Sequence, residues 1–494
     1  MKNKLSLLTA SVLFALPALA PAAVTVNIVN GDAAGVGFND TTAATPVGGN
    51  NGTTIGQQRL IAYQRAAQVW SNTLSTNVPS AVTVNVYATW EALTCTATSA
   101  TLGSAGAAEV FSDFPNAPFA ATWYSAALAN KISGVDNSTA TVTPPTTGVP
   151  TKYQIRARFN VNLGQANCLS GSPFYLGLDN NPPASQTDLL VVLIHEIGHG
   201  LGFQTFTSGS TGAYLSNQPS IWDRYLTDGN TNQTWVQFTA AQRAASAISD
   251  RLVWGGQLVT SQVPSVLQQG TPNLKVTLPS TGLTTYAVGT ASFGPALSSP
   301  GITAQIGQVI DTAGNNGLAC NPNDATAAAT LSPANAAAVN GKIALVDRGT
   351  CGFVIKVKAC QDAGAIGVIV VDNAAGSPPA GLGGADPNIT IPAVRVTQSD
   401  GAAIKAALER RSRTSPANVT ATLGLDLSVR AGADASNRAK MYSPNPFISG
   451  SSVSHYDVSA TPNLIMEPNI NVGLGQSVVP PADLTYTLLR ETGW

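Results

Sequence analysis

One segment limits the possible folds more than any other, the run LLVVLIHEIGHGLGF at residues 189–203. Asn181-Pro182-Pro183 interrupts the chain just before it, and Ser185 with Asp188 resembles a capping box in which Asp replaces Glu, so a helix is expected from about residue 186. A helix that is apolar on every side is buried inside a sizeable core. Burying polar side chains is costly, so the three that interrupt this run need a purpose.

These three side chains form the pattern His195-Glu196-Ile197-Gly198-His199. Histidines at positions i and i+4 of a helix project from one face, so two imidazoles can hold one zinc ion. Zinc lowers the pKa of a bound water toward about 7. Glu196 is placed to accept the proton of that water as a general base. The alternative is a pair of ordinary core histidines beside a buried Glu, an expensive arrangement in a chain with only three histidines.

A catalytic zinc needs a third protein ligand. The first Glu after His199 is Glu409, which falls in a separate α/β segment, so a downstream Glu ligand is disfavoured. The compact extension H-E-x-x-H-x-x-G-x-x-H is incomplete, because Gly202 is present but Thr205 occupies the last position. Two candidates remain, Asp223 and the third histidine of the chain, His455.

The arrangement resembles the leishmanolysin-like metzincins, in which an insertion separates the third histidine from the helix and a Met-turn follows. The matching positions are His195, Glu196, His199, Gly202, Phe203, His455 and Met466. This resemblance implies that His195, His199 and His455 bind zinc, Glu196 is the base, and Met466 lies beneath the metal. It also implies an α+β catalytic domain with a mixed sheet and an active-site helix. It covers roughly residues 24–207 and 440–494, and 255 residues separate His199 from His455.

The insertion contains a second recognisable pattern, from Gly341 to Ile369, which is similar to the protease-associated (PA) domain. Its expected elements are strands at 342–347, 365–371, 392–396 and 419–425, with helices at 353–363 and 399–410. No cluster of His, Cys or Glu lies in this unit, so no catalysis is assigned to it. The resemblance implies contact with substrate or partner, or a lid, and the alternative is a passive spacer.

The N-terminal part contributes an amphipathic helix at 57–74 and alternating strands at 82–87 and 153–161. The strand at 153–161 is the expected sheet edge, where an extended peptide would bind by strand addition. Residues 208–280 are expected to be irregular, with short helices such as Thr239–Ile248.

The first residues predict export. A basic start, Met1–Lys4, precedes an apolar run and small residues, which is typical of a signal peptide ending near Ala22. The alternative is a membrane anchor, for which the run is short. The five cysteines suit an oxidising compartment. The sequence alone does not fix the pairing of the cysteines, and the pairs we expect are Cys95–Cys168 and Cys320–Cys351, with Cys360 free of any disulfide.

Charged residues make up 10% of the chain and the net charge is −1, so nucleic-acid binding is not expected. The sequence therefore predicts a secreted or periplasmic zinc endopeptidase acting on protein or peptide, with no membrane attachment after signal cleavage. Structural calcium is possible, and the oligomeric state is undetermined. The alternatives are a non-catalytic binding protein with a structural zinc and a hydrolase of other amides.

The expected domain boundaries are 1–22 signal peptide, 23–207 catalytic N-terminal part, 208–280 connection, 281–425 PA domain and 426–494 catalytic C-terminal part.

Overall fold

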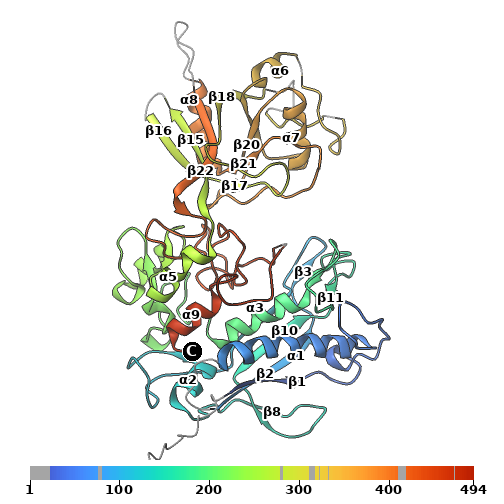
Figure 1. Cartoon of the computed structure of the whole chain (residues 1–494), viewed down its shortest axis with the longest axis vertical. Coiled ribbons are helices and arrows are strands. Elements are labelled where there is room, and N and C mark those ends of the chain that lie inside the picture. The colour runs from blue at the N-terminus through green and yellow to red at the C-terminus, as the bar shows by residue number, and fades with distance from the viewer. Residues whose placement is uncertain are drawn as a thin grey trace, which may run out of the picture.

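The computed structural model describes residues 23–75, 81–278, 282–310, 317–321, 323–331, 333–409, 419–471 and 473–494. The expected signal peptide lies outside these residues. The chain forms two lobes (Figure 1). We call residues 23–268 with 431–494 the main lobe and residues 269–430 the inserted lobe. Within the described residues, no helix combines the length and apolarity needed to cross a bilayer.

The main lobe is built on a four-stranded mixed sheet in the order β1-β2-β10-β5. β1 (Val24–Asn30) and β10 (Ile155–Asn160) run parallel to β2 (Val82–Glu91). β5 (Gly103–Ala107) runs antiparallel to β10 and closes the sheet on that side. The expected edge strand at 153–161 was therefore wrong: this segment is internal and β5 is the edge. β5 has the sequence GSAGA, which lacks the β-branched and aromatic residues that mark strands.

Two helices cover one face of this sheet (Figure 1). α1 (Ile55–Leu74) begins at Thr54, whose side chain accepts a hydrogen bond from the Gln57 backbone. α3 (Leu189–Leu201) packs against α1, β5 and β10, and every one of its residues is buried. It begins three residues later than expected, because Asp188 itself caps the helix: its carboxylate accepts from the N–H groups of Leu190 and Val191.

The inserted lobe is an eight-stranded sheet in the order β16-β15-β22-β18-β19-β20-β21-β17. It includes β15 (Gln269–Leu278) and β22 (Thr420–Arg430), so it extends beyond the expected limits of 281 and 425. β15 and β22 pair along most of their length and form the connection to the main lobe. The other strands are β16 (Gly282–Ala287), β17 (Gly289–Thr290), β18 (Ile302–Gln308), β19 (Ile343–Asp347), β20 (Gly367–Val371) and β21 (Ala393–Val396).

Helices lie on both faces of this second sheet. Alternate residues of β20 contribute to two cores: Ile369 packs on the side of α8 (Gln398–Glu409), and Val368 packs on the side of α7 (Phe353–Asp362). All five residues of β20 are buried, as expected for a central parallel strand covered on both faces. α6 (Pro333–Val339) lies beside β18.

The chain then returns to the main lobe and completes its core. Met441, Tyr456 and Met466 pack in the same cluster as residues of α1 and α3. α9 (Thr485–Thr492) contacts α5 (Gln257–Val266). The remaining elements are α2 (Ala126–Ser133), α4 (Ala240–Ser246), β3 (Cys95–Thr96), β4 (Ser99–Ala100), β6 (Val110–Phe111), β7 (Tyr124–Ser125), β8 (Thr141–Val142), β9 (Thr151–Lys152), β11 (Phe174–Tyr175), β12 (Thr187–Asp188), β13 (Leu226–Asp228), β14 (Leu252–Trp254) and the short 3-10 turns η1 (Gly37–Asn39), η3 (Leu215–Asn217), η4 (Trp222–Arg224) and η5 (Trp235–Gln237).

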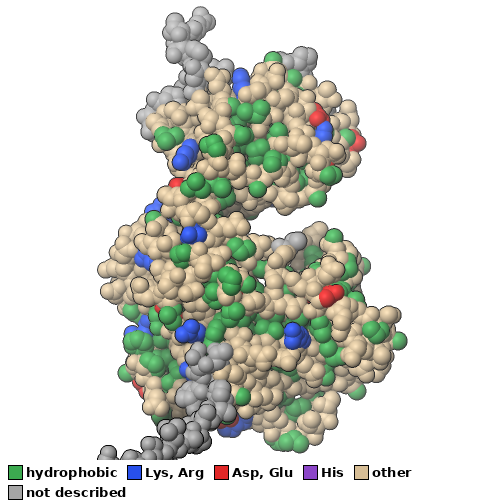
Figure 2. Space-filling model, in the orientation of Figure 1, with side chains coloured by type: hydrophobic (Ala, Val, Ile, Leu, Met, Phe, Trp, Pro, Cys, Tyr) green, Lys and Arg blue, Asp and Glu red, His purple; other side chains and the backbone are tan. Residues whose placement is uncertain are grey.

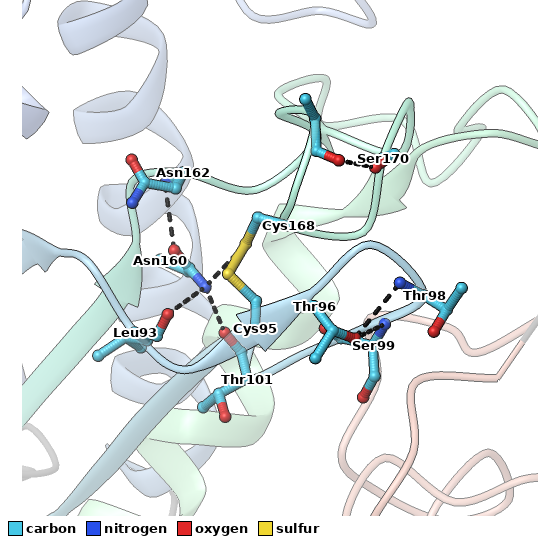
Figure 3. The surroundings of a disulfide bond; sticks show 11 residues. Leu93, Cys95, Thr96, Thr98, Ser99, Thr101, Asn160, Asn162, Cys168 and Ser170 are labelled. Carbon is cyan, nitrogen blue, oxygen red and sulfur yellow. Dashed lines mark hydrogen bonds between the residues drawn. A yellow bond between two sulfur atoms is a disulfide. The ribbon is translucent and has the colours of Figure 1, made fainter.

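Both expected disulfides are present, Cys95–Cys168 in the main lobe and Cys320–Cys351 in the inserted lobe. The Cys95–Cys168 disulfide ties the β3-β4 hairpin to the segment after β10, and this hairpin leads directly into β5 (Figure 3). Beside it, Asn160 donates from Nδ2 to the carbonyls of Leu93 and Thr101. The segment that precedes the edge strand is thus attached to the end of β10.

Candidate metal centre

The structure brings the three histidines of the chain together. The Nε2 atom of His199 lies 3.1 Å from that of His195 and 3.1 Å from that of His455, and the third Nε2 pair is 3.3 Å apart. Among the described residues, these three are the His, Cys, Asp and Glu side chains grouped closely enough to share an ion. Four-coordinate zinc with Zn–N bonds of about 2.0–2.1 Å places its nitrogen ligands roughly 3.3 Å apart, so the spacing fits zinc.

The other ring nitrogens decide which tautomer each imidazole adopts. The Nδ1 atoms of His195, His199 and His455 each lie 2.7 Å from a backbone carbonyl oxygen, those of Ile465, Phe203 and Ser451 respectively. A carbonyl only accepts, so Nδ1 carries the proton and Nε2 keeps its lone pair for a metal. Three rings held in this way present three converging lone pairs.

Burial keeps these rings neutral. It lowers the pKa of His195 to about 4 and that of His199 to about 3. Burial, followed by the neighbouring rings, also lowers the pKa of His455 well below its usual value. Metal ligation requires the neutral imidazole, so these side chains are in the form that binds a cation.

Glu196 lies in the same cleft and is 8% exposed. Burial raises the pKa of its carboxyl to about 8, and a hydrogen bond with the Ala105 backbone opposes this shift. Ala105 belongs to β5, so the candidate base lies beside the edge strand. In addition to the metal ligands, the cleft therefore combines a carboxyl group with a strand edge.

Met466 is fully buried beneath the helix. A Cβ atom built on Gly198 would lie 2.9 Å from the Met466 sulfur, so the thioether packs directly against the turn that joins the two histidines. The backbone of Met466 also accepts a hydrogen bond from Tyr456, the residue after His455. Met466 thus packs against the helical turn that carries His195 and His199.

Two buried carboxyls that the sequence reasoning missed hold this turn. Glu467 accepts from the Leu464 backbone and from the Asn471 side chain. Asp483 accepts from the N–H of Ile465, whose carbonyl contacts His195. Glu467 directly follows the Met, which is a usable signal, whereas nothing in the sequence connects Asp483 with the site.

The alternative ligand Asp223 lies outside the histidine group. Its buried carboxylate accepts hydrogen bonds from the hydroxyls of Thr205, Thr207 and Ser220. Thr205 and Thr207 line the cleft, and the Thr205 backbone also donates to Ser454, next to His455. These hydrogen bonds account for the burial of Asp223, which supports a wall of the cleft.

The cleft around the histidines has a volume of about 670 Å³. Its walls come from residues 100–105, from α3, from residues 204–209, from residues 447–455 and from residues 468–470. Among the described residues that line it, Glu196 is the only acidic group and no Lys or Arg is present. Charge is also sparse on the visible surface, where basic and acidic side chains are widely scattered (Figure 2).

Comparisons with known proteins identify part of the chain. The PA domain model matches residues 305–404, inside the inserted lobe. The probable lipoprotein aminopeptidase LpqL of Mycobacterium tuberculosis is 36% identical over 84 residues, which is 17% of this chain and 16% of that protein. The chain thus matches about one sixth of this relative's length.

Solved structures give weaker matches. An aminopeptidase from Aneurinibacillus sp. strain AM-1 is 20% identical with a TM-score of 0.23, over 42% of each chain. The zinc aminopeptidase BSAP from Bacillus subtilis is 22% identical with a TM-score of 0.21, over 45% of this chain and 44% of that one. The inserted lobe contains a PA domain.

Proposed function

We propose that the protein is an exported zinc-dependent endopeptidase with a metzincin-like catalytic domain. The observation that carries the proposal is the convergence of three Nε2 lone pairs, from residues 195, 199 and 455, beside one buried carboxyl. When bound there, zinc would supply Lewis acidity toward a carbonyl and toward water. A structural site needs no base, so Glu196 supports catalysis over a purely structural zinc.

The residues of the chain provide the rest of the chemistry. A cation held by the three histidines would lower the pKa of Glu196 from the value that burial alone produces. The ionised carboxylate then accepts a proton from the attacking water and returns it to the nitrogen of the leaving amine. Within the described residues β5 pairs with β10 alone, so its outer edge, beside Glu196, can pair with an extended polypeptide through backbone hydrogen bonds. Glu196 and the three histidines are buried, which lowers the local dielectric constant and strengthens their polar contacts.

The composition of the cleft favours cleavage within a chain. An aminopeptidase needs an acidic group for the substrate's terminal ammonium, and a carboxypeptidase needs Arg or Lys for the terminal carboxylate. The described lining residues include no Lys or Arg, and their one carboxyl is Glu196. The named relatives are aminopeptidases. The lack of a second acidic group among the described lining residues distinguishes the proposed endopeptidase from an aminopeptidase.

Two disulfides support an oxidising destination, in agreement with the expected export signal. The proposed substrate class rests on the composition of the cleft. Calcium binding remains a prediction.

The test is proteolysis of casein and of internally quenched peptides by zinc-loaded protein, with product ends identified by mass spectrometry. We expect internal cleavage. Glu196→Gln should lower kcat by about 10²–10⁴-fold while zinc content stays at wild-type level, because the base is lost and the ligands are kept. Zinc-loaded protein that cleaves no peptide would favour the binding-protein alternative, and hydrolysis restricted to non-peptide amides would favour the other hydrolase.

A further inference from the structure

A second cavity, of about 630 Å³, lies between the two lobes. The inserted lobe contributes Asn273, Tyr286 and the loop at residues 378–381. The main lobe contributes Lys440, Asp457 and Asn469. Neither the histidines nor Glu196 line this cavity, so the proposed chemistry leaves it unexplained.

The interlobe cavity adjoins the histidine cleft along two segments of the chain. Asn469 lines both cavities. Its neighbours Pro468 and Ile470 line the histidine cleft, and Asn471 lines the interlobe cavity. The segment at residues 442–455 is shared in the same way: its first residues line the interlobe cavity and its later ones the histidine cleft. The two spaces therefore share walls.

The inserted lobe is attached to one of these walls. Ser377 and Asn445 exchange two backbone hydrogen bonds, with N···O distances of 2.7 and 2.5 Å. Ser377 immediately precedes the loop at 378–381, and Asn445 is two residues before Phe447, which lines the histidine cleft. The position of the PA-domain loop is thus linked directly to the wall of the candidate active site.

The chemistry of the interlobe cavity differs from that of the histidine cleft. Among the described residues that line it, three are acidic (Asp250, Asp426 and Asp457) and one is basic, Lys440, which is 3.1 Å from Asp250. This leaves an excess of negative charge. Such an excess attracts cations, whereas the cleft around the histidines is almost uncharged.

Two polar groups in its walls are incompletely satisfied. Asn273 and Asp457 are 5% and 2% exposed. Within the described part of the chain, neither Asn273 Nδ2 nor Asp457 Oδ2 has a hydrogen-bond partner. One is a donor and the other an acceptor, and a buried polar group without a partner costs about 1–3 kcal/mol. A polypeptide carrying a cationic side chain supplies a matching acceptor and donor.

We propose that the interlobe cavity is the distal part of the substrate groove and binds a polypeptide segment with a basic side chain, away from the scissile bond. This inference rests on the proposed endopeptidase function and adds a substrate class to it. The PA domain then selects long substrates with Lys or Arg in the extension, while uncharged residues occupy the histidine cleft.

The test uses internally quenched peptides with one cleavable core. The core is compared alone and with extensions at either end that carry Lys, Gln or Glu. For the wild-type protein we expect kcat/KM to be at least fivefold higher for the long Lys peptide than for the core or the Glu peptide. Ala380→Trp places a bulky ring in the cavity from an exposed position and should reduce this ratio toward one. The matched control Ala375→Trp, exposed in the same lobe outside the cavity, should keep the wild-type ratio.

A second variant avoids the bulky ring. Asp426→Asn removes one carboxylate with little change in volume and should reduce the preference for Lys over Gln. Equal kcat/KM values for the core and all extended peptides, with the core still cleaved internally, would overturn the inference and leave the endopeptidase function standing.

A binding experiment separates the two proposals. Fluorescence anisotropy with zinc-loaded Glu196→Gln should show tighter binding of the labelled long Lys peptide than of the core. Adding Ala380→Trp should weaken that binding at least fivefold, and equal affinity would overturn the inference. Absence of cleavage by the wild-type protein, together with selective binding by Glu196→Gln, would reject the endopeptidase and keep the cavity as a polypeptide site.

Discussion

At the residue scale, the glycines of α3 let neighbouring groups approach the helix. A Cβ atom built on Gly200 would lie 2.3 Å from the Cγ2 atom of Ile155 in β10, so the absence of a side chain sets the distance between helix and sheet. Ala is otherwise the better helix former by about 1 kcal/mol. The glycines of the motif therefore serve packing rather than helix formation.

Gly200→Ala should lower the free energy of unfolding by about 1–3 kcal/mol, because the new methyl group cannot be accommodated without moving α3 or Ile155. Gly383→Ala is the matched control, since a Cβ atom there would meet no atom within 4 Å, and its effect should stay within about 0.5 kcal/mol. Chemical denaturation measures both. Equal stability of the two variants would show that the helix can shift away from the sheet at no cost.

Glu467, below the histidines, should make stability depend on pH. Burial raises the pKa of its carboxyl to about 8, against about 4.3 in an unfolded chain. The folded state thus binds the proton of Glu467 more tightly than the unfolded state does. The stabilisation that this difference provides is complete below about pH 4 and is lost as the pH rises to about 8.

Glu467→Gln imitates the protonated carboxyl and should remove this loss. One pKa unit corresponds to about 1.4 kcal/mol, so the variant should gain a few kcal/mol over the wild-type protein between pH 5 and pH 8, and the gap should level off above pH 8. Denaturant titrations at several pH values measure the gap. A gap that is independent of pH would mean that Glu467 is ionised throughout this range.

At the element scale, the cleft depends on how the edge strand is supported. β5 itself consists of small residues, and its position comes from pairing with β10 and from the hairpin that Cys95–Cys168 and Asn160 hold beside it (Figure 3). None of these groups contacts the histidines. If the proposed function is correct, the support of β5 affects the binding of an extended substrate more than the binding of zinc.

The double variant Cys95→Ser/Cys168→Ser should raise KM for peptide substrates severalfold and leave zinc content unchanged, because the strand edge is loosened while the ligands stay in place. Steady-state kinetics with parallel zinc analysis measures both quantities. Cys320→Ser/Cys351→Ser, which opens the disulfide of the inserted lobe, is the control and should keep the KM for short peptides. An unchanged KM in the first variant would show that pairing with β10 alone holds β5.

At the scale of the whole molecule, a metal would join parts of the chain that are far apart in sequence. His199 and His455 are 256 residues apart and meet only because the chain returns after building the inserted lobe. A ligand that binds the folded state alone stabilises it by about 4 kcal/mol at a thousandfold excess over Kd. The closure of the main lobe should therefore depend on the ion.

A chelator should lower the Tm of the zinc-loaded protein by several degrees, and added zinc should restore it. His455→Ala removes one ligand, so it should contain little zinc and show almost no shift with chelator. Calorimetry with and without chelator measures this, and the inserted lobe serves as an internal reference if the lobes unfold separately. A full chelator shift in His455→Ala would remove His455 from the site.

Local patterns were sufficient for much of this architecture. The apolar run around His195 predicted a buried helix, and the alternating and apolar runs of the insertion predicted the PA-domain elements. These predictions succeed because a helix face and a buried strand are set by neighbours a few residues away. The start of α3 was misplaced because Asp188 and Ser185 both suit a cap, and packing selected Asp188.

What the sequence determined by itself was the kind of chemistry available: two imidazoles and a carboxylate on one helical turn, one further histidine, and an uncharged background. The tertiary structure alone decided that His455 joins that turn, that Asp223 does not, that β5 rather than β10 forms the edge, and that Asp483 supports the site. The physical reason is the long sequence separation between the residues in contact. These outcomes depend on contacts between segments that are tens to hundreds of residues apart, and such contacts are set by the packing of the whole core.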